Sequence, residues 1–453
     1  MFDLIQREKE MSLLNDAFQS LKAQFLVVWG RRRVGKTYLL EAFAQKHRSI
    51  YYTATQQSEA IELKAFTNVV RESLLVSDLP VGYFFPDWPS ALDYISKKAE
   101  HERLVLIFDE FPYLAESTEG IESIFQRWWD KQGKKSNMML ILCGSAIAYM
   151  QQLISASAPL HQRSTLNLYV APFDFLGVGN FFKKLSFEDK AIVYGILGGT
   201  PLYLEQWDEN QNIRFNLVKL FANPASPLVD AAELVLSGEL RNIQGAFRIL
   251  QAIASGATRA AQIQDFAQVA VERPLKKLQT LGFITRKVPI FDTPETSKRA
   301  IYRLSDPYFI FWFRFIAPHR DQIARGLGEQ LIDHKIIPYL DDYMGPIFEE
   351  MARHHARRKF DIERVDSWWS TDGKHEIDLV GLKAHRALEF VGTVKWSSKL
   401  LGKAVLDNLE DHAVALKDFG PKTKKLIYGR KGCQQSLCDN PLIQCFSIED
   451  IYA

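Results

Sequence analysis

Eight consecutive residues, Gly30 to Thr37, read GRRRVGKT and have the types and spacing of a phosphate-binding loop. Glycines at both ends of the loop let the backbone wrap so that successive N–H groups point at one phosphate. Lys36 supplies an ammonium for the outer phosphates, and Thr37 supplies a hydroxyl that can ligate Mg²⁺. The motif therefore predicts a site for a nucleoside triphosphate with magnesium. We expect the site to be lined by Gly30, Arg31, Arg32, Arg33, Val34, Gly35, Lys36, Thr37 and Tyr38.

Two acidic residues follow the apolar run LVLIF at 104 to 108. A buried strand would deliver both to a sheet edge, where Asp109 would hold Mg²⁺ through water and Glu110 would polarise the attacking water. This pair predicts hydrolysis as well as binding, and two solvated acids at a strand end are the alternative. Ser145, after the next apolar run, is a candidate sensor of the terminal phosphate or an ordinary helix N-cap.

Arg163, in the stretch PLHQRSTLNLY, is a candidate arginine finger. It stands between a loop and an extended segment, from which it would reach a phosphate in its own or a neighbouring subunit. A structural salt bridge is the alternative. The predicted catalytic residues are Lys36, Glu110, Ser145 and Arg163, and the predicted metal ligands are Thr37 and Asp109.

These residues need a parallel sheet to bring them together. Short apolar runs at 25–29, 49–54, 104–108 and 138–143 alternate with helical stretches, which is the pattern of a parallel sheet covered on both faces. From about 170 to 235 the sequence turns helical and predicts a small lid. The fold class expected is α/β, with a P-loop NTPase sheet and a helical lid, followed by an α+β winged helix and a small α/β domain.

Several of these segments, IQREKEMSLLNDAF, VVWGRRRVGKTYLL, IFDEFPYL, CGSAIAYM and GGTPLYL, together resemble the archaeal-type ATPase family, related to AAA+ and STAND NTPases. The resemblance implies that ATP is the nucleotide. It implies that Arg7 lies beside this nucleotide and that Pro201, in a Gly-x-Pro lid motif, approaches the adenine. It further implies a winged helix and a C-terminal domain similar to restriction endonucleases. The family as a whole implies no particular substrate.

Three short helices at 243–254, 260–268 and 272–281, followed by two strands around a polar loop, predict a winged helix. Basic residues gather on its third helix and hairpin, where winged-helix DNA readers meet the double helix. A protein-docking role is the alternative. The predicted nucleic-acid contacts are Lys276, Lys277, Arg286, Lys287 and Arg299, with Lys298 and Arg303 in the same cluster.

The C-terminal segment resembles a nuclease site with one ligand missing. Restriction-endonuclease-like enzymes place an aspartate on one strand and Glu-x-Lys on the next, so that two carboxylates bind Mg²⁺. Asp378 and Lys395 fit this pattern, but Thr393 stands where the glutamate is needed. Glutamates on a helix at 344–357, Glu349 or Glu350, are the candidates for a further acid. We expect a degraded site, formed by Glu349, Asp378 and Lys395, that binds without cutting.

Composition limits the remaining choices. The net charge of +2 over 453 residues means that any nucleic-acid surface is a local patch. The apolar run at 308–317 is too short for a membrane span and contains an arginine, so it predicts a buried helix. No signal peptide is evident, which predicts a cytoplasmic protein, and the four cysteines lack zinc-ligand spacing and are expected to be unpaired thiols.

The chain is therefore expected to contain four parts: an ATPase core at 1–168, a lid at 169–235, a winged helix at 236–318 and an endonuclease-like domain at 336–453. The function expected is an ATP-hydrolysing switch acting on DNA, with a protein partner or a second copy of the chain as other candidate partners. A nucleotide-gated regulator with little turnover, or an ATP-dependent nuclease, are the alternatives.

Overall fold

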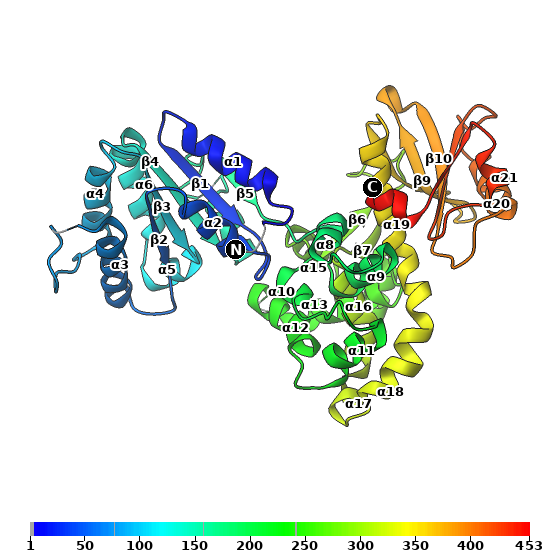
Figure 1. Cartoon of the computed structure of the whole chain (residues 1–453), viewed down its shortest axis with the longest axis horizontal. Coiled ribbons are helices and arrows are strands. Elements are labelled where there is room, and N and C mark those ends of the chain that lie inside the picture. The colour runs from blue at the N-terminus through cyan, green and yellow to red at the C-terminus, as the bar shows by residue number, and fades with distance from the viewer. Residues whose placement is uncertain (1–3, 77, 157, 241) are drawn as a thin grey trace. The chain divides into compact units, whose positions relative to one another are not determined.

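The computed structural model describes residues 4–76, 78–156, 158–240 and 242–453 (Figure 1). The chain divides into two compact units. The first extends to Phe173 and includes Thr200–Leu202, and the second comprises Asp174–Gly199 and Tyr203–Ala453. Within the described residues, no helix combines the length and hydropathy needed to cross a bilayer.

The first unit is built on a five-stranded parallel sheet with the order β2-β3-β4-β1-β5. Its strands are β1 (Gln24–Trp29), β2 (Ser49–Thr53), β3 (Leu104–Asp109), β4 (Met138–Gly144) and β5 (Leu166–Tyr169). Every side chain of β3 and β4 is buried, which explains why these segments read as unbroken apolar runs. The prediction of a parallel sheet is confirmed.

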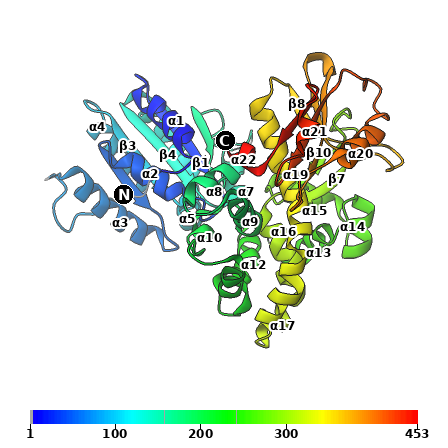
Figure 2. The same cartoon turned by 45° about the vertical axis from the view of Figure 1, so that its right-hand side comes forward.

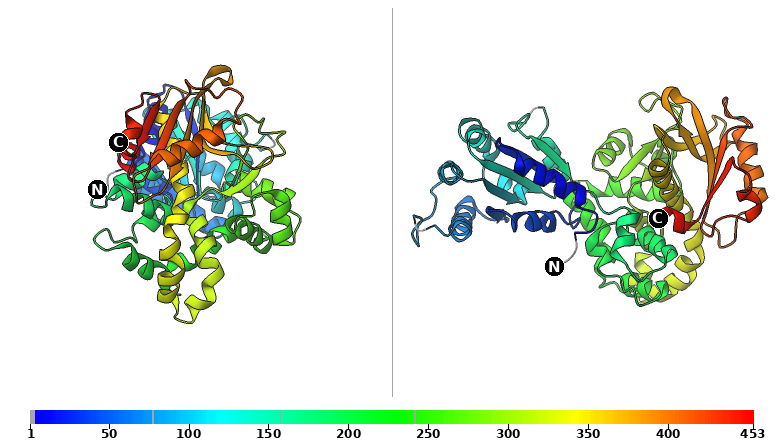
Figure 3. Two further views of the ribbon diagram at one scale, coloured as in Figure 1. Left: turned by 90° about the vertical axis from the view of Figure 1, so that its right-hand side faces the viewer. Right: turned by 45° about the horizontal axis from the view of Figure 1, so that its top comes forward.

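Helices cover both faces of this sheet (Figures 1 and 3). They are α1 (Glu8–Gln19), α2 (Lys36–Ala44), α3 (Glu59–Leu74), α4 (Trp88–Lys98), α5 (Phe111–Ser117), α6 (Ile121–Lys131) and α7 (Ile147–Leu153). Side chains of β1 alternate between two cores. Phe25 and Val27 pack with α3, α4 and α6, whereas Leu26 and Val28 pack with α1 and α2. The period of two along β1 thus anchors helices on opposite faces.

Helices come first in the second unit. They are α8 (Phe175–Phe181), α9 (Phe187–Leu197), α10 (Pro201–Leu204, whose first two residues group with the first unit), α11 (Ile213–Leu217) and α12 (Pro227–Glu239). The predicted winged-helix segment then contains α13 (Ile243–Ala254), α14 (Ala260–Ala267) and α15 (Glu272–Thr280). An antiparallel hairpin of β6 (Ile284–Lys287) and β7 (Ile301–Leu304) follows. Three helices and a hairpin therefore lie where the sequence predicts them.

The segment expected to be a polar connector, 319–335, is helical. It contains α17 (Arg320–Ala324) and α18 (Gly328–Leu331), and it follows α16 (Pro307–Phe311). Ile323, Leu331 and Ile332 are buried, so a few well-spaced apolar residues are enough to pack this stretch although its average composition is polar. The apolar run at 308–317 is buried as predicted.

The C-terminal part of this unit is a mixed five-stranded sheet with the order β12-β11-β10-β9-β8 (Figure 2). Its strands are β8 (Arg364–Trp369), β9 (Glu376–Leu382), β10 (Leu388–Lys395), β11 (Lys424–Gly429) and β12 (Ile443–Phe446). The long helix α19 (Leu340–Lys359) precedes them, and α20 (Lys403–Ala413), α21 (Gln435–Cys438) and α22 (Ile448–Tyr452) follow. The sequence predicted the three central strands but not the edge strands β8 and β12.

Candidate functional site

The phosphate-binding loop joins β1 to α2 in the first unit, as its motif predicts. Gly35 has a φ of +92° and caps α2, a conformation that only glycine adopts without strain. At Gly30 a Cβ atom would lie 2.2 Å from the carbonyl oxygen of Val170, so the backbone there approaches β5 too closely for any side chain. Both glycines are therefore required by the shape of the loop.

The Lys36 side chain lies folded inside the loop. Its ammonium is buried and donates hydrogen bonds to the carbonyl oxygens of Gly30 at 3.0 Å and Arg31 at 2.9 Å. Burial lowers the pKa of Lys36, and the nearby Glu110 and Asp109 carboxylates act in the opposite direction. An ammonium has three donors, so these two contacts leave the side chain able to serve a phosphate from the same position.

Asp109 lies at the end of β3 and joins the loop to the sheet edge. One of its carboxylate oxygens accepts hydrogen bonds from the Thr37 hydroxyl at 2.7 Å and from the Tyr51 hydroxyl at 2.8 Å. The other accepts from the backbone N–H of Glu110 at 2.9 Å. A hydroxyl and a carboxylate oxygen in contact are hard donors of the kind that Mg²⁺ prefers. The structure thus brings the two predicted metal ligands together.

Tyr51 is a site residue that the sequence interpretation missed. It lies on β2, next to β3 in the sheet, and burial, together with the Asp109 carboxylate, raises its pKa. The tyrosine therefore stays protonated and donates to Asp109. In the sequence, Tyr51 is only a polar residue within an expected strand. Its role can be recognised only when the strand order places β2 beside β3.

Glu110 is held by Ser145 at the same edge of the sheet. Its backbone is left-handed, with a φ of +51°, and its carboxylate accepts a hydrogen bond from the Ser145 hydroxyl at 2.9 Å. Helix α7 begins at Ile147 with Ala146 as its N-cap, so the alternative that Ser145 is an ordinary helix cap is wrong. Ser145 is buried and lies against the Glu110 carboxylate, and its role as a sensor of the terminal phosphate stays a prediction.

Arg163 lies elsewhere. Its guanidinium makes a two-pronged salt bridge with Asp130, at 2.8 and 3.1 Å, and donates to the carbonyl oxygens of Pro159 and His161. Asp130 lies in the last turn of α6, before β4 begins, and Arg163 precedes β5, so both lie at the amino edge of the parallel sheet. The phosphate loop lies at the carboxyl edge. The prediction of an arginine finger acting on its own chain is wrong, and the salt-bridge alternative is confirmed. A role in a neighbouring subunit stays a prediction.

Arg7 contacts the phosphate-binding loop through its guanidinium. Its buried guanidinium donates to the carbonyl oxygens of Val34 at 2.9 Å and Ala171 at 2.8 Å, pairs with Glu10 at 3.2 Å and lies over the ring of Phe173. Burial lowers the pKa of Arg7. These contacts connect the loop to the segment with which the first unit ends. Pro201 begins α10 and groups with this unit, and its approach to a nucleotide stays a prediction.

The basic residues predicted to contact nucleic acid separate into two groups in the structure. Lys276 and Lys277 are exposed on α15. On the hairpin, Arg286 donates to the carbonyl oxygen of Ser297 at 2.8 Å, Lys287 pairs with Glu350 at 2.6 Å, and Arg299 pairs with Asp292 and donates to the carbonyl oxygen of Trp369. Three of the hairpin cations, Arg286, Lys287 and Arg299, are therefore engaged within the protein, and contact with nucleic acid stays a prediction.

The hairpin loop is embedded in the C-terminal domain. Ile290 is fully buried in one core cluster with Trp368, Ile377 and Val391 of the C-terminal sheet. Its backbone N–H donates to the carbonyl oxygen of Ser367 at 3.1 Å. The hairpin thus contacts the C-terminal sheet of its own chain through apolar, backbone and charged groups, and the docking of another protein stays a prediction.

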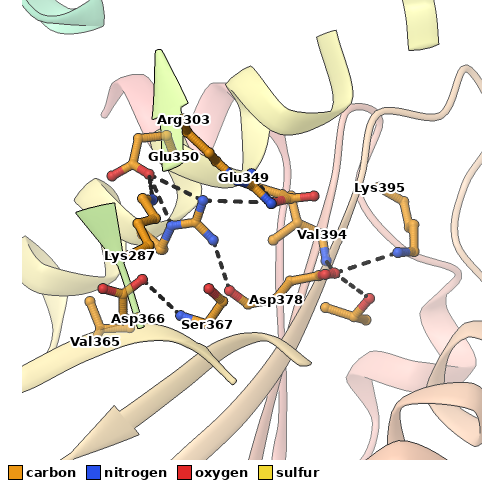
Figure 4. Close-up of polar contacts among 12 residues, drawn as sticks. Lys287, Arg303, Glu349, Glu350, Val365, Asp366, Ser367, Asp378, Val394 and Lys395 are labelled. Carbon is orange, nitrogen blue, oxygen red and sulfur yellow. Dashed lines mark hydrogen bonds and ion pairs between the residues drawn. The ribbon is translucent and has the colours of Figure 1, made fainter. Parts of the chain in front are cut away.

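The Asp378 carboxylate accepts hydrogen bonds from the residues around it (Figure 4). One carboxylate oxygen accepts hydrogen bonds from the Thr393 hydroxyl at 3.0 Å, the backbone N–H of Val394 at 2.8 Å and the Lys395 ammonium at 3.4 Å. Thr393 therefore acts as a donor to the aspartate, where a glutamate would have been a second anionic ligand.

Glu349 and Glu350 have different surroundings. Desolvation and the nearby Asp378 carboxylate raise the pKa of Glu349. Desolvation acts in the same direction on Glu350, but Arg353 and Lys287 hold its pKa at about 2. Glu349 lies 3.6 Å from Arg353 and 3.9 Å from Arg303, so arginines of the chain already face this acid (Figure 4). Within the described residues, no group of three or more acidic, histidine or cysteine side chains is placed to hold a metal ion.

Comparison with known proteins agrees with the N-terminal site. Residues 4–207 match the family described as an ATPase domain predominantly from Archaea. Residues 312–408 match a family described as archaeal and bacterial proteins of unknown function. The N-terminal segment is therefore similar to ATPase domains of this type, and the C-terminal match brings no function.

The relatives and solved structures that resemble this chain have low sequence identity to it. An uncharacterized protein of Methanocaldococcus jannaschii is 28% identical over 408 residues, covering 86% of this chain and 87% of the relative. The Walker-type ATPase of Pyrococcus abyssi gives a TM-score of 0.49 at 18% identity, covering 69% of this chain and 96% of the other. The ORC2 protein of Aeropyrum pernix, solved with ADPNP and ADP, gives 0.41 at 15%, covering 73% and 95%.

Proposed function

We propose that the first unit binds ATP with Mg²⁺ and hydrolyses it. The observation that supports this most directly is the convergence of Lys36, Thr37, Asp109 and Glu110 at one edge of the sheet, with Thr37 and Asp109 in direct contact at 2.7 Å. In a chance glycine turn, neither the hydroxyl–carboxylate contact nor the positioned glutamate would be expected. The match of residues 4–207 to an ATPase domain points to the same chemistry.

The residues divide the work as follows. Backbone N–H groups of the loop and the start of α2 would cradle the phosphates, and Lys36 would neutralise charge on the outer two. Thr37 and Asp109 would hold Mg²⁺, whose contribution is to neutralise the charge that develops on the phosphate oxygens. Glu110 would orient and polarise the attacking water, and Ser145 would keep its carboxylate in place.

We further propose that hydrolysis drives a switch, with DNA as the candidate target. Two observations support this extension. Arg7 joins the loop to the end of the first unit, and Lys276 and Lys277 are exposed on α15, where they are suited to phosphate backbones. The helices at 169–235 would be the lid, and residues 236–318 the winged helix. The alternative is a nucleotide-gated DNA- or protein-binding regulator with little turnover.

The site is tested by two substitutions. Lys36→Ala should abolish ATP binding because it removes the ammonium that meets the phosphates. Glu110→Gln should keep binding and lose turnover because the amide cannot act as a base. Binding is measured with a fluorescent ATP analogue and turnover by phosphate release. The exposed Arg127 on α6, changed to Gln, is the control. Undiminished turnover in both variants would refute the assignment.

The role of DNA is tested by measuring turnover with and without duplex DNA. Strong stimulation would support an ATPase that works on DNA. Slow turnover that DNA leaves unchanged would favour the regulator. A Mg²⁺-dependent plasmid-nicking activity that Asp378→Ala abolishes would instead support the nuclease alternative, against which the Thr393 contact argues.

A further inference from the structure

The phosphate loop of the first unit contains arginines that are candidates for the phosphate contact that Arg163 cannot make in its own chain. Three arginines follow Gly30, and the structure distinguishes them. Arg31 is buried, whereas Arg32 and Arg33 are exposed. Arg32 reaches across the loop to α5 and donates a hydrogen bond to the Tyr113 hydroxyl at 2.8 Å.

Two backbone contacts relate Arg32 and its partner Tyr113 to the proposed catalytic residues Lys36 and Glu110. The carbonyl oxygen of Arg31, in the peptide that leads into Arg32, accepts the Lys36 ammonium at 2.9 Å. At the other end, Tyr113 belongs to the helical turn after Glu110, since its N–H donates to the Glu110 carbonyl oxygen at 2.9 Å. The Arg32 side chain therefore links the phosphate loop to the helix that follows the proposed catalytic acid.

We propose that Arg32 is the arginine that contacts the γ-phosphate of ATP, and that Tyr113 holds it at the mouth of the site until the nucleotide arrives. This assignment rests on the ATPase function proposed above. A guanidinium bonds far more strongly to a phosphate than to a neutral phenol, because both partners are then charged and two parallel hydrogen bonds can form. Arg32 would leave Tyr113 for the phosphate and stabilise the charge that builds up on it during transfer.

The test compares Arg32→Gln with Arg127→Gln, which removes the same charge from the exposed face of α6 in the same unit. Affinities for ATP and ADP and the kcat for ATP are measured for each. Arg32→Gln should weaken the binding of ATP by about 10- to 100-fold, which corresponds to the loss of one charged hydrogen bond. The affinity for ADP should not change, because ADP lacks the γ-phosphate. The kcat should fall as well. Tyr113→Phe removes the competing hydroxyl and should tighten ATP selectively.

Three results would overturn the assignment. Equal weakening of ATP and ADP with unchanged kcat would make Arg32 a scaffold residue of the loop. A larger and ATP-selective loss in Arg33→Gln would transfer the role to the neighbouring arginine. An Arg32→Gln protein indistinguishable from Arg127→Gln would remove the role altogether. If the unmodified protein binds ATP without turnover, the proposed hydrolysis fails, and the ATP-to-ADP preference still tests Arg32 by itself.

Discussion

Truncating Ile290, in the hairpin loop, tests whether the predicted winged-helix segment and the C-terminal sheet share one core. Ile290→Ala removes three carbons from a side chain that is fully buried against Trp368, Ile377 and Val391. At about 0.8 kcal/mol for each buried carbon the transfer loss is about 2.4 kcal/mol, and the cavity left behind brings the expected destabilisation to about 3 kcal/mol.

Hydrogen exchange measured by mass spectrometry reports this loss strand by strand. A loss of about 3 kcal/mol should speed exchange in β9 and β10 by about 100-fold if these strands open together with the loop. Thr296→Ala, an exposed change in the same loop, is the matched control and should leave exchange unaltered. Faster exchange confined to β6 and β7, with β9 and β10 unchanged, would show that the loop only rests on the C-terminal domain and would refute the shared core.

Three further predictions concern other parts of the chain. Burial lowers the pKa of His355 from 6.5 to about 4. The unfolded state therefore binds a proton at a higher pH than the folded state does. The free energy of unfolding should fall by up to about 3 kcal/mol as the pH drops from about 6.5 to about 4. In urea unfolding, His355→Gln should reduce the pH dependence of the free energy of unfolding. An unchanged pH dependence would show that His355 is not its cause. Arg163→Gln should cost about 1 kcal/mol in thermal denaturation and leave kcat unchanged, whereas a large fall in kcat would return it to the site. Changing Lys276 and Lys277 to Ala should reduce the slope of log K against log salt for duplex DNA by about 2, and an unaltered slope would exclude α15 as the contact.

The sequence alone was sufficient for features whose residues are contiguous. The phosphate loop is eight adjacent residues, and backbone geometry links their order directly to a shape, so Gly30, Gly35, Lys36 and Thr37 could be assigned without a structure. Apolar runs of strand length likewise predicted the parallel sheet, because a strand covered on both faces must be apolar throughout.

Contacts between distant segments were decided only by the tertiary structure. Arg163 proved to lie at the amino edge of the sheet, and Tyr51 proved to contact Asp109, because strand order and direction set which side chains share an edge. The cations of the hairpin looked like a DNA surface from their charge alone. Their partners, Glu350 and the carbonyl of Trp369, come from elements that follow much later in the chain.

The same limit applies to Asp378 and Thr393. Their types showed that a carboxylate ligand is missing, and pattern matching could go no further. Only the antiparallel pairing of β9 and β10 places the Thr393 hydroxyl 3.0 Å from the aspartate, as a donor in its own right. The sequence determined which chemical groups are available, and the pairing of distant strands decided which of them meet, because hydrogen bonds and ion pairs act over a few ångströms in space regardless of separation along the chain.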